Sequence, residues 1–312
     1  MRTALAYLRA GAGAIGAMPN ALAEIAKARR PRTLVYFGGS PGDDLLCTPI
    51  LDRLAAAGAG PLWMMSNHPD LFRHNPSVAH VVPFDDALAY ALSMLGVRRL
   101  RLRYHDYVAA DDRSVAPAEH IIRLLARRAG IDPSAVELTP RVYLDEAERS
   151  WGRFGDRQIA IQSSTRSAAM PIENKEWFPE RFQHVVDTLG GEFTIVQLGA
   201  ASDPALEGAI DLRGKTTIRE AASVLLHSSV FIGLVGFLMH LAKAVDTRSV
   251  IVYGGREHPS QSGYSDNVNL YTDLPCAPCW YWNHSPYNRE CMRRIRSVDV
   301  ISAVRTLMKS EV

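Results

Sequence analysis

The chain has 312 residues, of which 47% are hydrophobic and 22% are charged. This composition is typical of ordinary globular proteins and excludes fibrous and disordered classes. The formal net charge of +2, from 35 basic and 33 acidic residues, gives no reason to expect a nucleic-acid partner. Four cysteines in a chain of this length do not suggest a disulfide scaffold, and from this we expect a cytoplasmic protein. Because the length is too great for one typical core, we expect two domains.

The N-terminal segment 1–30 is rich in alanine, with scattered arginine and lysine. Arg9, Gly11 and Gly13 interrupt its apolar residues, so it lacks the apolar core of a signal peptide. No run of about 18 apolar residues predicts a transmembrane helix. Two interpretations of the segment stay open. It is a surface helix or extension, or it is a helix that lies on a membrane and brings the protein to the inner membrane face.

Apolar, β-branched runs alternate with helical segments through the first half of the chain. A glycine-rich loop, 38–44, joins the first strand to the first helix, and Pro49 fits the first turn of that helix. The expected strands are 33–37, 61–65, 80–83 and 100–108, and the expected helices are 45–57, 87–95 and 119–129.

The alternation restarts after a polar linker, 140–156. The expected strands are then 158–162, 193–198, 230–234 and 249–253, and the expected helices are 178–189, 217–226 and 297–309. Strands that alternate with helices predict parallel sheets. We therefore expect an α/β fold of two Rossmann-like domains that face a cleft, with a boundary near residue 155.

The segment 229–245 consists of an apolar strand, a glycine-containing turn and a helix that starts near Met239. The first N–H groups of a helix have no partner within it, so this arrangement predicts an anion-binding site. Between Gly42 and Pro49, a strand also leads into a helix. That loop lacks the spacing of a P-loop or of a dinucleotide fingerprint. It offers a carboxylate, Asp43 or Asp44, as a proton acceptor, although both residues could also be helix N-terminal acids.

Several short motifs stand in order along the chain. They are Gly42-Asp-x-Leu-x-x-Thr48-Pro49, Asn75-Pro-x-Val78, Asp211-Leu-x-Gly-Lys-Thr-Thr-Ile218, Met239-His-Leu-Ala242, and Leu274-Pro-Cys-x-Pro-Cys279 followed by Cys291-Met292. Each motif is weak alone. The ordered set, over nearly the whole chain, resembles glycosyltransferase family 9, the heptosyltransferases.

This resemblance implies a GT-B fold and an enzyme that transfers a sugar with inversion, without a catalytic metal or other cofactor. The donor would be a nucleotide-sugar, by family analogy ADP-heptose. The acceptor would be a hydroxyl or amine on a glycolipid, a protein or a small metabolite. Residues 1–155 would form the acceptor-binding domain, with an extra helix over 1–30. Residues 156–296 would bind the nucleotide-sugar, and 297–312 would form a C-terminal helix.

The resemblance also implies roles for individual residues. Asp43 matches the family's catalytic base, and Lys175 matches its phosphate-binding lysine, unless Lys175 is only an exposed residue at a helix end. His240 would contact the donor, or else it is a structural hydrogen-bonding residue. The further donor-binding residues would be Ser163, Ser164, Arg166, Lys215, Gly236, Met239 and Leu241, and the acceptor-side residues would be Gly42 and Asp44.

Some positions depart from the family pattern. Val235 and Ala201 stand where the family carries acidic donor contacts, and 167–173 is an insertion. A transferase with a reshaped donor site is our main interpretation. A GT-B scaffold that binds a nucleotide-sugar or a partner without transfer is the alternative, and a nucleotide-sugar epimerase is a third, which the order of the motifs disfavours.

Two features near the C-terminus, a group of cysteines and an aromatic tract, each allow two interpretations. Cys276, Cys279 and Cys291 are weak metal-ligand candidates, because a metal would want a fourth ligand such as His284. The tract 280–282, Trp-Tyr-Trp, is either a sugar-stacking platform or an interdomain packing surface.

Overall fold

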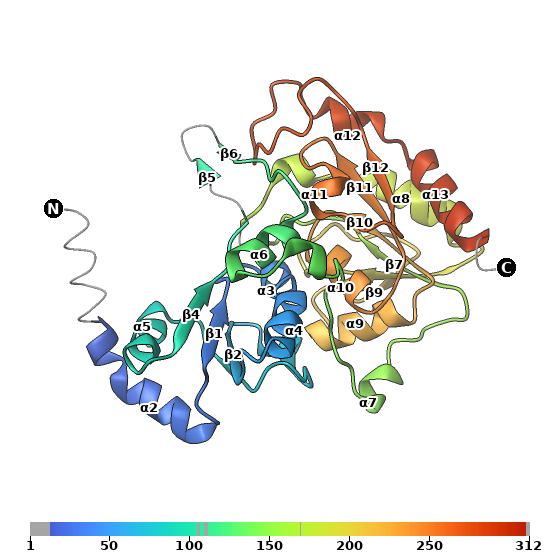
Figure 1. The fold of residues 1–312 in the computed structure, drawn as a ribbon. Coiled ribbons are helices and arrows are strands. Elements are labelled where there is room, and N and C mark those ends of the chain that lie inside the picture. Colours follow the sequence, from blue (N-terminus) through green and yellow to red (C-terminus); the bar gives the residue numbers. More distant parts are fainter. Residues whose placement is uncertain (1–12, 105–106, 109–111, 169, 310–312) are drawn as a thin grey trace.

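The computed structural model describes residues 13–104, 107–108, 112–168 and 170–309. The N-terminal part of the helix expected over 1–30 therefore lies outside the described residues. The strands form two parallel sheets and a short antiparallel hairpin (Figure 1). The first sheet has the order β3-β2-β1-β4, and the second has the order β12-β11-β10-β7-β8-β9.

The strands of the first sheet all precede the linker, and those of the second sheet all follow it. The first sheet consists of β1 (Thr33–Tyr36), β2 (Leu62–Met65), β3 (His80–Val82) and β4 (Arg98–Arg101). The second sheet consists of β7 (Gln158–Gln162), β8 (Thr194–Leu198), β9 (Ile210–Asp211), β10 (Val230–Leu234), β11 (Ser249–Gly254) and β12 (Val268–Tyr271). The hairpin pairs β5 (Tyr107–Val108) with β6 (Arg113–Ser114).

Helices cover both faces of each sheet. Those of the first half are α2 (Met18–Lys27), α3 (Pro41–Leu45), α4 (Thr48–Ala56), η1 (Pro69–Phe72), α5 (Asp86–Met94), α6 (Ile121–Ala129), η3 (Pro133–Ala135) and the linker helix α7 (Glu146–Arg149). Those of the second half are η4 (Glu173–Lys175), α8 (Pro179–Leu189), α9 (Ile218–Leu226), α10 (Phe237–Ala244), α11 (Pro259–Ser262), α12 (Glu290–Arg294) and α13 (Ser297–Lys309). Among the described helices, none combines the length and the apolar content needed to cross a bilayer.

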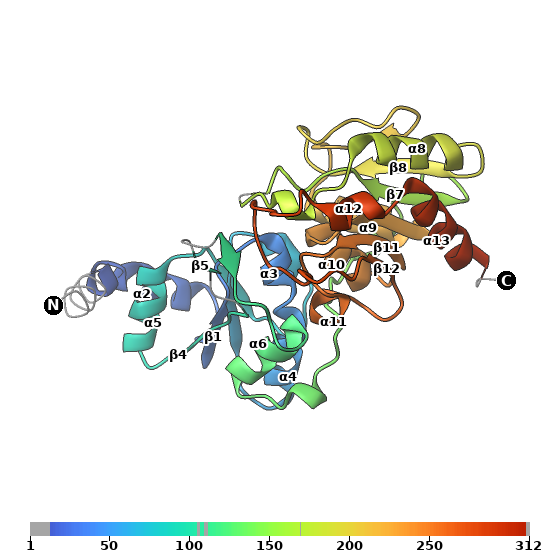
Figure 2. The same cartoon turned by 90° about the horizontal axis from the view of Figure 1, so that it is seen from above.

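The apolar core is layered. Helices α2 and α5 pack on the outer face of the first sheet, and α8 and α13 pack on the outer face of the second. Between the two sheets, side chains of α3, α4, α6, α9 and α10 form one continuous cluster. Figure 2 shows α3 and α10 between the two halves. The carboxyl ends of both central strands therefore point toward one interface.

The structure corrects several expected boundaries. The helix expected over 45–57 is two helices, because Pro49 has no N–H to donate to the Leu45 carbonyl, and the Thr48 hydroxyl binds that carbonyl instead, at 2.8 Å. The strand expected over 100–108 is β4, which starts at Arg98, followed by the separate β5. Helix α10 begins at Phe237, two residues before the expected start.

Candidate active site

The first turn of α3 lies against the first turn of α10. A methyl group added to Gly42 would lie 3.5 Å from Phe237 Cα and 3.8 Å from His240 Cδ2. The predicted acceptor-side loop and the predicted donor-side helix terminus are thus brought together, although they belong to different sheets. Gly236 precedes α10, and a Cβ there would lie 3.5 Å from Thr165, so the loop after β7 borders the same place.

Asp43 is held by three hydrogen bonds. Its Oδ2 accepts from the Ser40 N–H and hydroxyl, both at 3.0 Å, and its Oδ1 accepts from the Tyr104 hydroxyl at 2.8 Å. The bonds to Ser40 complete a capping box, because Ser40 Oγ also accepts from the Asp43 N–H. Asp43 therefore caps the N-terminus of α3, and the same bonds fix the direction of its carboxylate. The expected loop over 38–44 is helical from Pro41 because of this cap.

Asp44 points the other way. Its Oδ2 accepts from the Ser66 hydroxyl at 2.5 Å and lies 3.0 Å from His68 Nδ1. Burial raises the pKa of this carboxyl group. The strand order explains the divergence, because β2 and β4 flank β1, so consecutive residues after β1 reach side chains that follow different neighbouring strands.

Lys175 is mostly buried, with 17% of its side chain exposed, and its Nζ lies 2.6 Å from Glu257 Oε1. It is therefore not an exposed helix-end lysine. Arg256 is paired with the same carboxylate, which also accepts from the Ser262 hydroxyl at 2.9 Å. Burial alone would raise the pKa of Glu257, but the two cations outweigh it and hold the pKa at about 2.

Arg256 and Glu257 were not predicted from the sequence. The Arg256 guanidinium lies 4.7 Å from the Trp280 ring centroid, and its Nε donates to the Tyr281 carbonyl at 3.0 Å. The aromatic tract thus packs around a buried cation rather than offering an open sugar platform. Trp282 Nε1 also donates to Ser114 Oγ at 2.8 Å, which ties the tract to the first half of the chain.

The remaining predicted donor residues divide into two groups. His240 is buried, and its Nδ1 lies 2.7 Å from the Tyr264 hydroxyl. Burial, together with the charge of Lys175, lowers its pKa to about 3, so the ring is neutral at pH 7. The side chains of Met239 and Leu241 are wholly buried in the core. They cannot contact a ligand, and any donor contact there is limited to the backbone of α10.

The hydroxyl and cationic candidates have local partners. Ser163 and Ser164 are buried and donate to the Pro204 carbonyl at 2.7 Å and to Glu176 Oε2 at 2.8 Å, respectively. Arg166 is exposed and pairs with Glu173 at 3.0 Å. Lys215 is exposed after the edge strand β9 and binds the Asp211 carbonyl at 2.7 Å. The structure does not bring Lys215 to the Lys175 cluster.

Three cysteines, Cys276, Cys279 and Cys291, line one cavity, and His284 is not among its lining residues. Among the described residues, these thiols do not bring three ligand atoms within 4.8 Å of one another. Burial raises the pKa of Cys279 and Cys291 in the metal-free protein. A metal-binding role for the three thiols that line this cavity stays a prediction.

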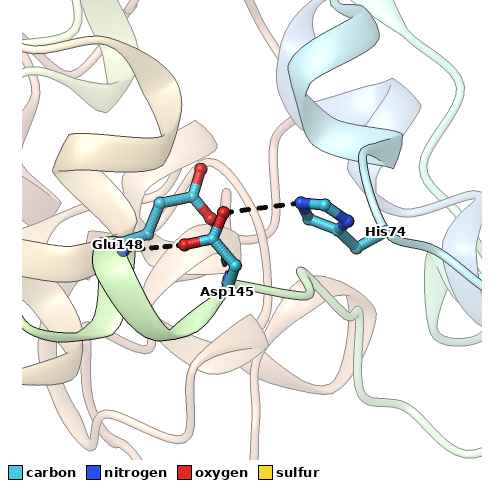
Figure 3. A group of neighbouring side chains, drawn as sticks. All are labelled: His74, Asp145 and Glu148. Carbon is cyan, nitrogen blue, oxygen red and sulfur yellow. Dashed lines mark hydrogen bonds and ion pairs between the residues drawn. The ribbon is translucent and has the colours of Figure 1, made fainter.

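Within the described part of the chain, the group that does bring three ligand atoms within 4.8 Å is His74, Asp145 and Glu148 (Figure 3). Its acids already have partners. Glu148 accepts from Arg219 and from Arg73, and Asp145 Oδ1 accepts the Glu148 N–H at 2.9 Å as the cap of α7. The group is an ion-pair cluster at the linker.

Comparison with known proteins gives a family and a fold. The family model described as glycosyltransferase family 9 (heptosyltransferase) matches residues 118–285, more than half of the chain. No curated protein sequence matches significantly. TibC, an iron-containing dodecameric glycosyltransferase from enterotoxigenic E. coli H10407, superposes with a TM-score of 0.73 at 19% identity, covering 91% of this chain and 77% of that one. A complex of TibC with ADP-D-beta-D-heptose superposes with a TM-score of 0.70 at 19% identity, covering 91% of this chain and 78% of that one.

Two further structures agree. The ADP-heptose lps heptosyltransferase II of E. coli gives a TM-score of 0.67 at 15% identity, covering 90% of this chain and 99% of that one. The family 9 glycosyl transferase of Veillonella parvula DSM 2008 gives a TM-score of 0.65 at 16% identity, covering 91% of this chain and 99% of that one. The predicted GT-B fold is confirmed.

Proposed function

The chain belongs to glycosyltransferase family 9, the heptosyltransferase family, and from this we propose that it moves a sugar from an ADP-sugar onto an acceptor hydroxyl or amine, with inversion at the anomeric carbon. Because TibC was solved with ADP-D-beta-D-heptose, heptose is the proposed sugar. In this proposal, residues 1–155 hold the acceptor and residues 156–296 hold the donor.

One observation supports this proposal above the others: a carboxylate and two cations from different sheets share one site. The charge of Asp43 acts on Lys175. The Tyr104 hydroxyl, which binds Asp43, lies within the fields of Glu257 and Arg256. The candidate proton acceptor of the first half and the candidate phosphate-binding cations of the second half therefore interact electrostatically, which supports a shared site.

The chemistry follows from these groups. The acceptor oxygen or nitrogen attacks the anomeric carbon, and its proton passes to Asp43. The bond from that carbon to the diphosphate oxygen breaks, and the electron pair leaves with the nucleoside diphosphate. Lys175 and Arg256 stabilise the charge that the diphosphate gains, together with the backbone N–H groups at the start of α10. No divalent metal is assigned to this step.

Acceptor-dependent release of ADP tests the proposal. Purified protein is incubated with ADP-heptose and candidate acceptors, ADP is quantified, and the anomeric configuration of the product is read by NMR. Val235 and Ala201 motivate the alternative, a scaffold that binds the nucleotide-sugar without transfer. Saturable binding of ADP-heptose with no release of ADP, over a broad acceptor panel, would favour that alternative.

We also propose that α2 contacts a membrane surface. Ile15 and Leu22 are 67% and 53% exposed, and Lys27, Arg29 and Arg30 follow them. Exposed apolar side chains beside basic ones match an anionic bilayer surface. Leu22→Glu should lower co-sedimentation with anionic vesicles several-fold. Ala23→Glu, which adds the same charge at a neighbouring exposed position, should lower it less. Equal effects of the two substitutions would contradict an apolar contact.

A further inference from the structure

Glu257 is a buried acid that lies beside Lys175. It follows β11, and its carboxylate binds Lys175, Arg256 and Ser262. Its charge also acts on His240 of α10 and on Tyr104 of the first half. The carboxylate thus has three partners in the second half and interacts electrostatically with Tyr104 of the first.

The positions at which the family carries acidic donor contacts hold no acid here. Val235 follows β10 and is buried in the apolar cluster between the sheets. Ala201 is exposed and lies beside Gly214, where an added Cβ would come within 2.7 Å of the Ala201 side chain. Donor hydroxyl groups need acceptors when they are taken out of water. Strand β11 lies beside β10, with Leu234 opposite Val252, so Glu257 follows the strand next to the one that Val235 follows.

We propose that Glu257 is a donor-binding residue whose carboxylate accepts hydrogen bonds from hydroxyl groups of the donor sugar, in place of the acids absent at 201 and 235. This inference rests on the proposed function. The donor diphosphate takes Lys175 and Arg256 as its counter-ions, and Glu257 exchanges its ion pair with Lys175 for the sugar hydroxyls.

The charges of the cluster support such an exchange. One carboxylate holds two cations, so the cluster of Lys175, Arg256 and Glu257 carries an excess positive charge in a buried place. A diphosphate supplies the missing negative charge. Once the diphosphate binds, its negative charge repels the Glu257 carboxylate. The carboxylate then turns toward the donor sugar, whose hydroxyl groups can donate hydrogen bonds to it.

The experiment compares two ligands by isothermal titration: ADP-heptose, and ADP, which lacks the sugar. Glu257→Gln should weaken ADP-heptose binding about 10- to 100-fold, which is the range for losing hydrogen bonds to a charged group. Binding of ADP should stay within a few-fold of wild type or become tighter, because Lys175 is released. Glu257→Asp, which keeps the charge, should recover part of the ADP-heptose affinity.

Glu148→Gln is the matched control, because it also removes an arginine-paired carboxylate but lies on the linker helix. It should leave the ratio of the two affinities unchanged. If Glu257→Gln is too unstable, Ser262→Ala removes one hydrogen bond from the same carboxylate and should shift the ratio in the same direction. Equal loss of both ligands in Glu257→Gln would overturn the inference and make Glu257 a support for Lys175. Wild-type protein that binds neither ligand would instead overturn the proposed function.

Discussion

Two roles meet in the carboxylate of Asp43. It completes the cap of α3 through Ser40, and it accepts a hydrogen bond from Tyr104. The same hydrogen bonds that cap the helix fix the direction of the carboxylate, so a base would be held ready without reorganisation on substrate binding. The neighbouring Asp44 is turned away and committed to Ser66 and His68.

Asp43→Asn tests the base. The amide has a similar shape and can still accept in the cap, so the melting temperature and the ADP affinity should remain close to wild type. Turnover should fall by roughly 10²–10⁴, because a positioned proton acceptor contributes about that much. Initial rates of ADP release measure it. Turnover within a few-fold of wild type, with a large loss in Asp44→Asn, would transfer the role to Asp44.

Lys175→Ala tests the leaving-group cation. It should lower turnover, and it should weaken binding of ADP more than binding of adenosine, since only ADP carries the diphosphate that the ammonium group would contact. Lys243 is a matched control, because it is also mostly buried and ion-paired, with Asp266 at 2.7 Å. Lys243→Ala should leave the ADP-to-adenosine ratio unchanged. A Lys175→Ala protein that binds both ligands as wild type does would show that Lys175 is only structural.

At the scale of elements, Arg219 of α9 ties the two halves to their linker. It pairs with Glu148 of α7, and it donates to the carbonyls of Asp70 at 2.9 Å and of Tyr143 at 2.6 Å. One buried guanidinium thus contacts η1, the linker and the second half at once. A bidentate arginine–carboxylate pair has a fixed geometry. This cluster therefore fixes the direction in which the linker continues from the first half of the chain.

The pKa of Glu148 predicts how this cluster responds to pH. Hydrogen bonds from Arg219 lower the pKa of Glu148 to about 2, below its ordinary value of 4.5. A lowered carboxyl pKa stabilises the fold above the ordinary pKa, and that stability is lost as the pH falls from about 4.5 toward 2. Glu148→Gln should therefore cost about 1.5–3 kcal/mol of unfolding free energy at pH 7 and clearly less at pH 3. Urea denaturation at both pH values measures this.

Glu146→Gln, on the same short helix and exposed, is the control and should change the unfolding free energy little at either pH. A loss in Glu148→Gln that is equal at pH 7 and pH 3 would mean that packing, and not the ionised pair, holds the linker.

For the molecule as a whole, the sequence predicted the two α/β halves and the places of their central strands, because buried parallel strands are short apolar runs. It also predicted Asp43 and Lys175 through family motifs. It could not predict Tyr104, Arg256 and Glu257 as part of the site. Tyr104 binds Asp43 from beyond a neighbouring strand, and Glu257 binds Lys175 from a distant part of the second half. No local spacing in the sequence marks such contacts, because only the folding of each half creates them.

The same limit explains the weaker site predictions. The motif around His240 was read from the sequence, but its neighbours Met239 and Leu241 face the core, because α10 buries one side between the two sheets. Ser163 and Ser164 follow a buried strand, as expected, yet their hydroxyls satisfy nearby backbone and carboxylate groups. A sequence motif predicts the course of the backbone. Whether a side chain of that motif is free to bind a ligand depends on the polar groups that surround it in the fold.

The charge balance of the whole cleft leads to the last prediction. A departing diphosphate needs positive charge, which a divalent metal or fixed cations can supply. Here Lys175 and Arg256 lie within one buried cluster with a single carboxylate, and α10 adds its N-terminal N–H groups. Transfer should therefore proceed at an undiminished rate in EDTA, and added magnesium should change it less than two-fold. Metal content measured on the same sample gives the control, since a retained ion would make the chelator result uninformative. Activity abolished by EDTA and restored by magnesium would show that the cations of the cleft do not suffice for the leaving group.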